Sequence, residues 1–315
     1  MASGSKRVII AAMLGNMAIA ATKFTAAAFT GSSAMLSEGV HSTVDTGNQL
    51  LLLHGLRQAG RPACSRFPFG RGKEIYFYSF VVAILIFGLG AGISIYEGIL
   101  HLRHPEPAHT PWLNYAVLAA SLLFEGAAWS MALREFRRTK GERGWFRAVS
   151  RSKNPPLFVV LFEDTAAMLG LLAAFAGVLL SQVTGDPRYD GAASIVIGLV
   201  LAGTAAWLAW ETHGLLLGES AHPEVEEAIR NMTLAKPGIE QINELATLHM
   251  GPDYILVTLS VDFADHVRSN GVEQVTSELD RDIKTAFPRV RRVFIEAQSP
   301  DAPVSSLAPS STPDQ

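Results

Sequence analysis

The long apolar segments of this chain constrain its fold more than any other feature. Of its 315 residues, 49% are hydrophobic and only 17% are charged, whereas soluble domains carry about 25% charged residues. A helix needs about 20 mostly apolar residues to cross the hydrocarbon core of a bilayer. We therefore expect six membrane-spanning helices, at residues 8–30, 34–56, 76–100, 112–133, 157–182 and 192–214.

The first apolar segment has a second interpretation. Lys6 and Arg7 precede it, and Ala18-Ile19-Ala20 resembles the cleavage site of a signal peptide. We favour a retained span, because the apolar character continues to Thr30. Lys23 interrupts this span, and a lysine there can either reach the interface or face the interior of a bundle.

Charge divides the chain into two parts. Residues 1–218 contain 18 Lys and Arg against 13 Asp and Glu, whereas residues 219–315 contain 8 against 16. This predicts a six-span membrane domain over 1–218, followed by a cytosolic domain. Basic residues gather in two loops and near the N-terminus, so the positive-inside rule places both termini in the cytoplasm. The positive-inside rule alone accounts for these basic loops, so we expect no nucleic-acid partner. The acidic cytosolic domain and the short loops lead us to expect the lipid bilayer of a bacterial inner membrane.

Residues 219–298 show the pattern of a small α+β domain. A helix-like segment ends at Pro237-Gly238, and a second one covers 272–287. Strands are expected at 239–249, 254–263 and 290–297, the middle one with apolar residues at every second position. Two helices would cover one face of a three-stranded sheet. Residues 299–315 are rich in Pro and Ser and predict a disordered tail.

Two expected spans carry polar residues at membrane depth. In the second span, His41 and Asp45 lie four residues apart and share a helix face, which Asn48 continues. In the fifth span, Glu163 and Asp164 interrupt an apolar run. Imidazole and carboxylate ligands suit Zn²⁺ and its first-row neighbours. Protons would compete with metal for these groups, which is the physics of a cation/proton exchanger.

Other intramembrane carboxylates have structural interpretations. Glu38 lies near the end of the second span, where it can reach water, so it is either an entrance residue or structural. Glu163 is rotated by about 100° from Asp164 and either joins the metal site or faces another helix. Glu97 and Glu125 are expected to be structural or to lie at the ends of their spans.

Several motifs together resemble the cation diffusion facilitator family, over about residues 8–298. These are Ser37 to Asp45 (SEGVHSTVD), Phe69 to Glu74 (FGRGKE), Glu97-Gly98 with His104-Pro105-Glu106, and Glu163 to Ala167 (EDTAA), which is similar to one branch of the family. The resemblance implies a homodimer with six spans per protomer and a cytosolic ferredoxin-like domain. It also implies export of Zn²⁺ or a related ion from the cytoplasm in exchange for protons, by alternating access.

The resemblance also implies a transport site, formed by two residues four apart on the second span and two on the fifth. His41, Asp45 and Asp164 match this pattern, and the fourth position falls on Val160. The fourth ligand is then water, Glu163 or Asn48, or the site has only three ligands. A site richer in oxygen would tolerate Mn²⁺, Co²⁺, Ni²⁺, Fe²⁺ or Cd²⁺ beside Zn²⁺. His249, Asp262, Asp265 and His266, near the family's cytosolic metal pair, are expected at the surface.

Two further functions remain open from the residues. One is a metal sensor or scaffold whose transport has decayed, which the missing ligand at Val160 would explain. The other is a membrane-embedded enzyme that uses His41 and Asp45 as an acid–base pair, in which case Glu163 and Asp164 would have no role. We expect a transporter and not an enzyme.

Overall fold

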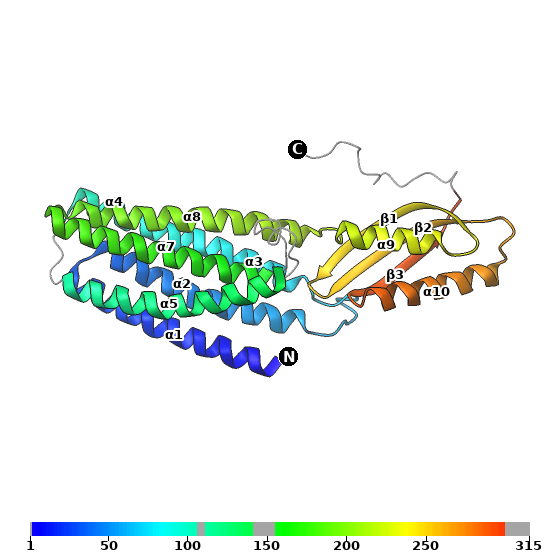
Figure 1. Cartoon of the computed structure of the whole chain (residues 1–315), viewed down its shortest axis with the longest axis horizontal. Coiled ribbons are helices and arrows are strands. Elements are labelled where there is room, and N and C mark those ends of the chain that lie inside the picture. Colours follow the sequence, from blue (N-terminus) through cyan, green and yellow to red (C-terminus); the bar gives the residue numbers. More distant parts are fainter. Residues whose placement is uncertain (1, 106–110, 141–154, 300–315) are drawn as a thin grey trace. The chain divides into compact units, whose positions relative to one another are not determined.

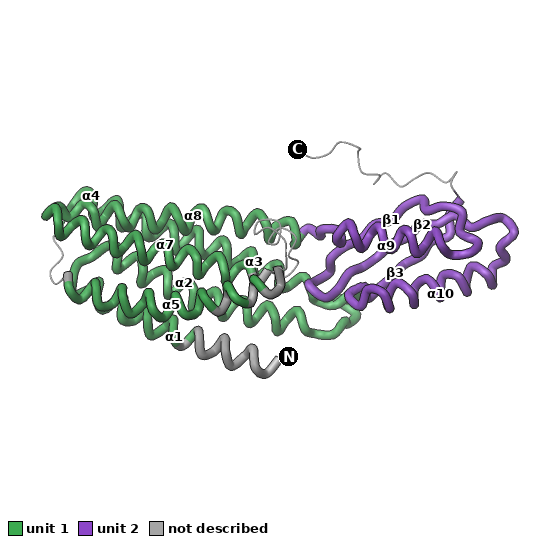
Figure 2. Tube along the Cα trace, in the orientation of Figure 1, with its two compact units in different colours: residues 1–216 green, residues 217–315 purple. Residues whose placement is uncertain are grey.

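The computed structural model describes residues 2–105, 111–140 and 155–299 (Figure 1). The chain divides into two compact units, residues 1–216 and 217–315, which we describe separately (Figure 2). The predicted disordered tail at 299–315, apart from Ser299, lies outside the described residues. Residues 141–154 of the basic loop between the fourth and fifth expected spans lie outside them as well. The domain limits expected from the sequence therefore stay a prediction.

The first unit is a set of long helices that run side by side (Figure 1). They are α1 (Ala2–Thr30), α2 (Ser33–Ala59), α3 (Glu74–Leu85), η1 (Ile86–Ala91), α4 (Gly92–Arg103), α5 (Pro111–Lys140), α7 (Pro155–Thr184) and α8 (Arg188–Leu217). Among the described residues, three helical stretches are long and apolar enough to cross a membrane: Glu74–Arg103, Phe158–Thr184 and Arg188–Leu217. The six-span arrangement accordingly remains a prediction.

A π-helical turn joins α3 to α4 in one continuous rod. This turn, η1, contains Gly88 and Gly90. Turns of this kind inside an α-helix occur often at functional sites. The sequence predicted a regular helix over this segment, and the turn differs from that prediction.

The start of α2 is fixed by a carboxylate from α8. Asp190 is buried, and its Oδ2 accepts hydrogen bonds from the backbone N–H groups of Ser33 at 2.7 Å and Ala34 at 3.3 Å. Its Oδ1 accepts a further bond from Ser32 Oγ at 2.8 Å. The first N–H groups of a helix have no partner within the helix, so an acidic side chain there stabilises the helix end. This contact sets where α2 begins relative to α8.

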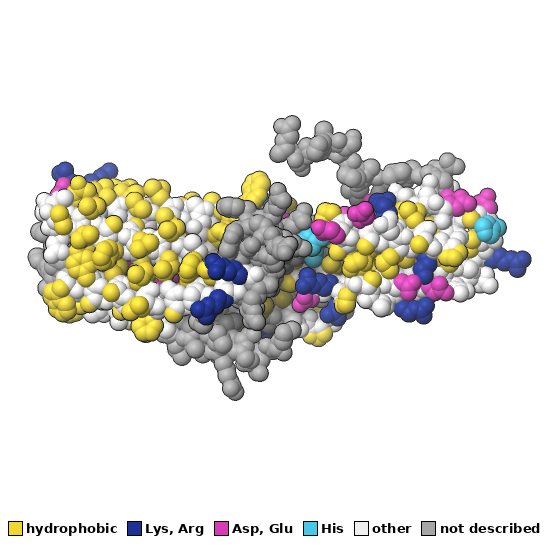
Figure 3. Space-filling view, in the orientation of Figure 1, with side chains coloured by type: hydrophobic (Ala, Val, Ile, Leu, Met, Phe, Trp, Pro, Cys, Tyr) yellow, Lys and Arg dark blue, Asp and Glu magenta, His cyan; other side chains and the backbone are white. Residues whose placement is uncertain are grey.

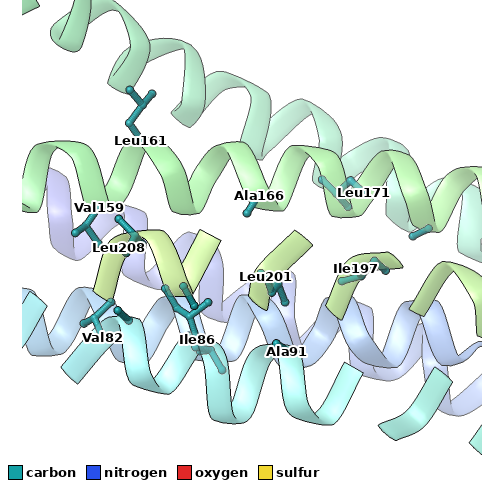
Figure 4. Close-up of a cluster of buried hydrophobic side chains, with 14 of the residues drawn as sticks. Val82, Ile86, Ala91, Val159, Leu161, Ala166, Leu171, Ile197, Leu201 and Leu208 are labelled. Carbon is teal, nitrogen blue, oxygen red and sulfur yellow. The ribbon is translucent and has the colours of Figure 1, made fainter. Parts of the chain in front are cut away.

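The apolar core of this unit lies between the α3–α4 rod, α7 and α8. Figure 4 shows Val82 and Ile86 of the rod near Val159 of α7 and Leu208 of α8. Leu161 points to the opposite side of α7. Close helix approach is possible because glycines meet at the crossing: a Cβ on Gly98 would lie 2.7 Å from the Gly191 carbonyl oxygen.

Large hydrophobic side chains cover much of the outer face of the first unit. Figure 3 shows them over its visible face, and Phe29, Leu123, Phe124, Val183 and Trp210 are among the most exposed. Contiguous apolar surface on this scale marks a surface that meets lipid or protein in place of water. The arrangement agrees with helices surrounded by a bilayer.

The second unit is an α+β layer. It contains α9 (Pro223–Leu234), β1 (Ile239–Gly251), β2 (Tyr254–Phe263), α10 (Ser269–Ala286) and β3 (Val290–Ala297). The sheet order is β1-β2-β3, with β1 antiparallel and β3 parallel to β2. The predicted α-β-β-α-β order and three-stranded sheet are confirmed.

The second unit has one apolar core, formed by its two helices and the sheet. Val257 and Leu259 of β2 pack with Ile229 of α9 and with Leu279 and Ile283 of α10. Both helices therefore bury apolar side chains in one core with the sheet. The prediction that His249 lies at the surface is wrong, because its side chain is buried and its Nδ1 lies 3.4 Å from the Gly251 carbonyl oxygen.

Candidate metal-transport site

The candidate site residues lie where α2 and α7 pack against each other. His41, Asp45 and Asn48 follow one another along α2 at spacings of four and three. At 3.6 residues per turn these spacings keep the three side chains on one side of the helix. All three side chains are buried, so α2 presents a polar stripe to the interior of the unit.

His41 and Asp45 meet directly. His41 Nδ1 lies 3.3 Å from Asp45 Oδ1. Neither ring nitrogen of His41 has a hydrogen-bond partner among the described residues, although the side chain is only 1% exposed. A buried imidazole without partners is costly unless it has a ligand to bind. A divalent cation is a ligand that imidazole nitrogen and carboxylate oxygen bind together.

Glu163 brings α7 into contact with this stripe. Asn48 Nδ2 donates a hydrogen bond of 2.5 Å to Glu163 Oε1, and the carboxyl groups of Asp45 and Glu163 are within hydrogen-bonding reach of each other. We call His41, Asp45, Asn48 and Glu163 the α2–α7 cluster. From the sequence, Glu163 could either join the metal site or face another helix. In the structure it contacts α2.

Asp164 lies beside the α2–α7 cluster. Its side chain is half-buried, and its charge acts on Asp45 through space. Among the described residues, no three His, Cys, Asp or Glu side chains are close enough to hold a metal ion together. The site residues are therefore neighbours in this conformation without forming a closed metal cage.

Val160 lies one turn before Asp164 on α7. Its side chain is half-buried and packs against the apolar core. An isopropyl group offers no donor or acceptor for a metal. The donor set around Asp164 thus depends on α2 and on Glu163.

A second polar cluster, which was not predicted from the sequence, is centred on Lys23 of α1. Its buried ammonium Nζ donates to Glu38 Oε2 at 3.0 Å, to Ser42 Oγ at 2.9 Å and to Glu125 Oε1 of α5 at 2.9 Å. Of the two positions considered for Lys23, the bundle interior is correct. The prediction that Glu38 can reach water is wrong, since its side chain is fully buried against Lys23. The signal available in the sequence was the lone lysine within an apolar run.

The two clusters and the helical unit that holds them define an integral membrane protein with ionisable groups in its interior, an arrangement typical of ion-translocating proteins. The chain belongs to the cation efflux family, whose transmembrane-domain model matches residues 9–217. This is a family of membrane-embedded transporters and not of enzymes.

Curated relatives agree with this assignment. The chain is similar to the "Proton-coupled zinc antiporter SLC30A9, mitochondrial" of Xenopus laevis, with 33% identity over 90% of this chain and 52% of that protein. The human protein of the same name is 33% identical over 84% of this chain and 47% of its own length. The "Cation-efflux pump FieF" of Cronobacter sakazakii is 25% identical, over 90% and 89%. The chain spans about half the length of the vertebrate relatives it matches.

The predicted bacterial inner membrane is wrong. Relatives from frog, mouse and human that match this chain at 33–34% identity are all named as mitochondrial proteins. The prediction was drawn from the acidic character of the expected cytosolic domain and from the short loops between the spans. Neither feature distinguishes one membrane from another.

Proposed function

We propose that this chain exports a divalent metal cation in exchange for protons. The observation that carries the proposal is the contact between α2 and α7, where a buried imidazole without hydrogen-bond partners and two carboxyl groups in mutual contact meet. Two carboxylates this close repel each other unless a cation or a proton lies between them. Such a site holds either metal or protons.

The proposal gives each residue a role. His41, Asp45 and Asp164 bind the cation, as the resemblance to the cation diffusion facilitator pattern implies. Glu163 contributes a further carboxylate, and Asn48 orients it through the 2.5 Å hydrogen bond. The adjacent Glu163 and Asp164 support placing the chain in the branch with a Glu-Asp motif in the fifth span.

Zinc is the first cation to test. Relatives at 33–34% identity are named as zinc antiporters, and one imidazole with carboxylates suits Zn²⁺. With Val160 in place of a fourth ligand, the donors are mainly oxygen. Mn²⁺, Co²⁺, Ni²⁺, Fe²⁺ and Cd²⁺ are therefore the competitors to include.

We extend the proposal to the assembly. The family resemblance supports a homodimer, six spans within residues 1–218, a ferredoxin-like domain over 219–298, and transport by alternating access. The β1-β2-β3 sheet with α9 and α10 packed in one core supports the ferredoxin-like assignment.

Zinc uptake by reconstituted vesicles tests this function. In vesicles with an outward proton gradient, we expect the wild-type protein to accumulate Zn²⁺, and Asp45→Ala or Asp164→Ala to reduce uptake at least about a hundredfold, as for the loss of a metal ligand or its close support. Glu97→Gln is the matched control, since this half-buried carboxylate of α4 lies outside both clusters. Its uptake should equal that of the wild type.

The same vesicles separate transport from sensing. The apolar Val160 at the fourth ligand position is the observation that favours a metal sensor with decayed transport as the second candidate. Zinc binding to the purified protein without uptake of Zn²⁺ or any of the competing ions would support the sensor and contradict the transporter.

A further inference from the structure

The cluster around Lys23 is separate from the proposed metal site. It joins α1, α2 and α5 through Lys23, Glu38, Ser42 and Glu125. In the described part of the chain, no hydrogen bond connects it to the α2–α7 cluster. On α2, however, Ser42 is adjacent to His41 in sequence, so the two clusters lie side by side within the same helix turn.

The charges of this cluster do not balance. One ammonium group faces two carboxyl groups, which leaves one negative charge in excess when all three are ionised. Glu38 Oε1 and Glu125 Oε2 are buried and have no hydrogen-bond partner among the described residues. Glu38 is fully buried, and the Glu125 side chain is 12% exposed. An uncompensated carboxylate in such surroundings is costly, and binding one proton removes the excess.

The packing leaves room for little else beside Glu38. Its Oε1 lies against α7 at Gly170, where a Cβ would come within 2.5 Å of it. A Cβ at Gly170 would also lie 3.7 Å from Cγ2 of Ile197 of α8, an apolar side chain. A proton needs no additional volume, whereas a hydrated metal ion does.

The cluster and the metal site act on each other electrostatically. The charge of Glu125 acts on Asp45 of α2 and Asp164 of α7, and the charge of Lys23 acts on His41. A divalent cation bound at His41 and Asp45 would therefore raise the potential at Glu125 and disfavour a proton there. Thermodynamic linkage requires the converse as well.

We propose that the Glu38–Glu125 pair, held by Lys23, is a second proton-binding site that is coupled to metal transport. One proton binds a carboxylate oxygen of the pair when the metal site is empty, and the net charge of the cluster goes from −1 to zero. Cation binding expels this proton to the side from which the metal entered. The inference rests on the proposed antiport and adds to it a proton carrier that is not a metal ligand.

The number of protons released per zinc bound tests this inference. In purified wild-type protein in detergent, a pH-indicator dye would count the protons released during a zinc titration. Glu125→Gln leaves Lys23 and Glu38 as a neutral pair that needs no proton. We expect this variant to bind zinc and to release one proton fewer than the wild type, and Glu38→Gln to do the same. Glu97→Gln should release the wild-type number.

Vesicles supply the second readout. Exchange of labelled for unlabelled zinc at equal pH needs no net proton movement, whereas accumulation driven by a pH gradient does. We expect Glu125→Gln to retain zinc exchange and to lose gradient-driven accumulation by about tenfold, within the range of allosteric coupling energies. If Glu125 had only a structural role, the variant would lose zinc exchange and gradient-driven accumulation to the same extent.

These measurements distinguish failure of the second proton site from failure of the proposed antiport. An unchanged proton count in both Glu125→Gln and Glu38→Gln would overturn the inference. Loss of zinc binding and exchange in both variants would also overturn it, since the cluster would then only hold the helices together. If the wild-type protein moves no metal at all, the proposed antiport fails first, independently of these variants.

Discussion

At the scale of residues, α2 carries two polar stripes with different partners. Glu38 and Ser42 face Lys23 of α1, whereas Asp45 and Asn48 face Glu163 of α7. Because both stripes lie on the same helix, a shift or rotation of α2 would change both at once. This helix is therefore the element through which the metal site and the Lys23 cluster are linked.

Val160 is the residue whose substitution tests the composition of the metal site. Val160→His would place an imidazole one turn before Asp164, and nitrogen ligands favour Zn²⁺ over Mn²⁺. We expect the ratio of zinc to manganese uptake to rise about tenfold, which corresponds to about 1.4 kcal/mol. Competition between the two ions in vesicles measures this ratio, with Val160→Leu as the control. An unchanged ranking of the ions would place Val160 outside the site.

The sequence predicted which side chains share a helix face, but it did not predict their partners. The four-residue spacing of His41 and Asp45 was sufficient to expect the contact found at 3.3 Å. Lys23 and Glu125 are 102 residues apart, and no periodicity within either helix indicates that they meet. Glu38 was misassigned for the same reason, since its burial depends on α1 and α5 and not on its position along α2.

At the scale of elements, Asp190 holds the beginning of α2. Asp190→Ala would leave the N–H groups of Ser33 and Ala34 without their acceptor in a buried position. We expect a loss of about 1–3 kcal/mol in the free energy of unfolding, the cost of buried groups left unpaired. Thermal unfolding in detergent measures it. Asp253→Ala, which removes only an exposed ion pair with Arg289, should leave the midpoint unchanged; equal midpoints for both variants would contradict the role of Asp190.

An ion pair at the surface of the second unit gives a pH dependence. Lys236, just after α9, lies 2.7 Å from Asp282 Oδ2 of α10. The hydrogen bond from Lys236 lowers the pKa of Asp282 below its usual value, and the same bond to Asp282 raises the pKa of Lys236. Since the folded-state pKa of Asp282 is depressed, its stabilisation is present above about pH 3.9 and is lost as the pH falls through the lowered pKa.

Hydrogen exchange in the full-length protein measures this effect. Protection of α9 and α10 should decrease as the pH falls below about 3.9, after correction for intrinsic exchange rates. In Asp282→Asn this part of the pH dependence should be absent. A variant with the wild-type profile would show that the pair contributes nothing to the packing of α9 against α10.

The elements themselves were predictable to different degrees. In β2, Ile255, Val257, Leu259 and Val261 alternate in the sequence and are buried in the structure, because a strand must place every second residue in the core. The π-helical turn η1 was not predicted, since an apolar run with glycines has the same pattern in either helix type. Three of the expected spans meet the criteria of length and apolarity, and the polar stripes of α2 reduce the apolar character of that helix.

At the scale of the whole molecule, the family match ends where the first unit ends. It covers residues 9–217, one residue beyond the end of the first unit at Leu216. If the protein is a homodimer, we expect deletion of residues 217–315 to weaken dimerisation more than it changes metal preference, because the proposed metal ligands all lie in α2 and α7. Mass measurements in detergent and ion competition in vesicles report the two properties. A truncated protein that stays dimeric but changes its metal preference would contradict this division.

The central claim is that metal and protons exchange at the α2–α7 contact. Simultaneous recording of zinc and pH inside vesicles tests it most directly. The account predicts that zinc entry is accompanied by proton exit, and that Asp45→Ala abolishes both signals while Glu97→Gln preserves them. Zinc entry without proton movement, or no flux with Zn²⁺, Mn²⁺, Co²⁺, Ni²⁺, Fe²⁺ or Cd²⁺, would contradict it.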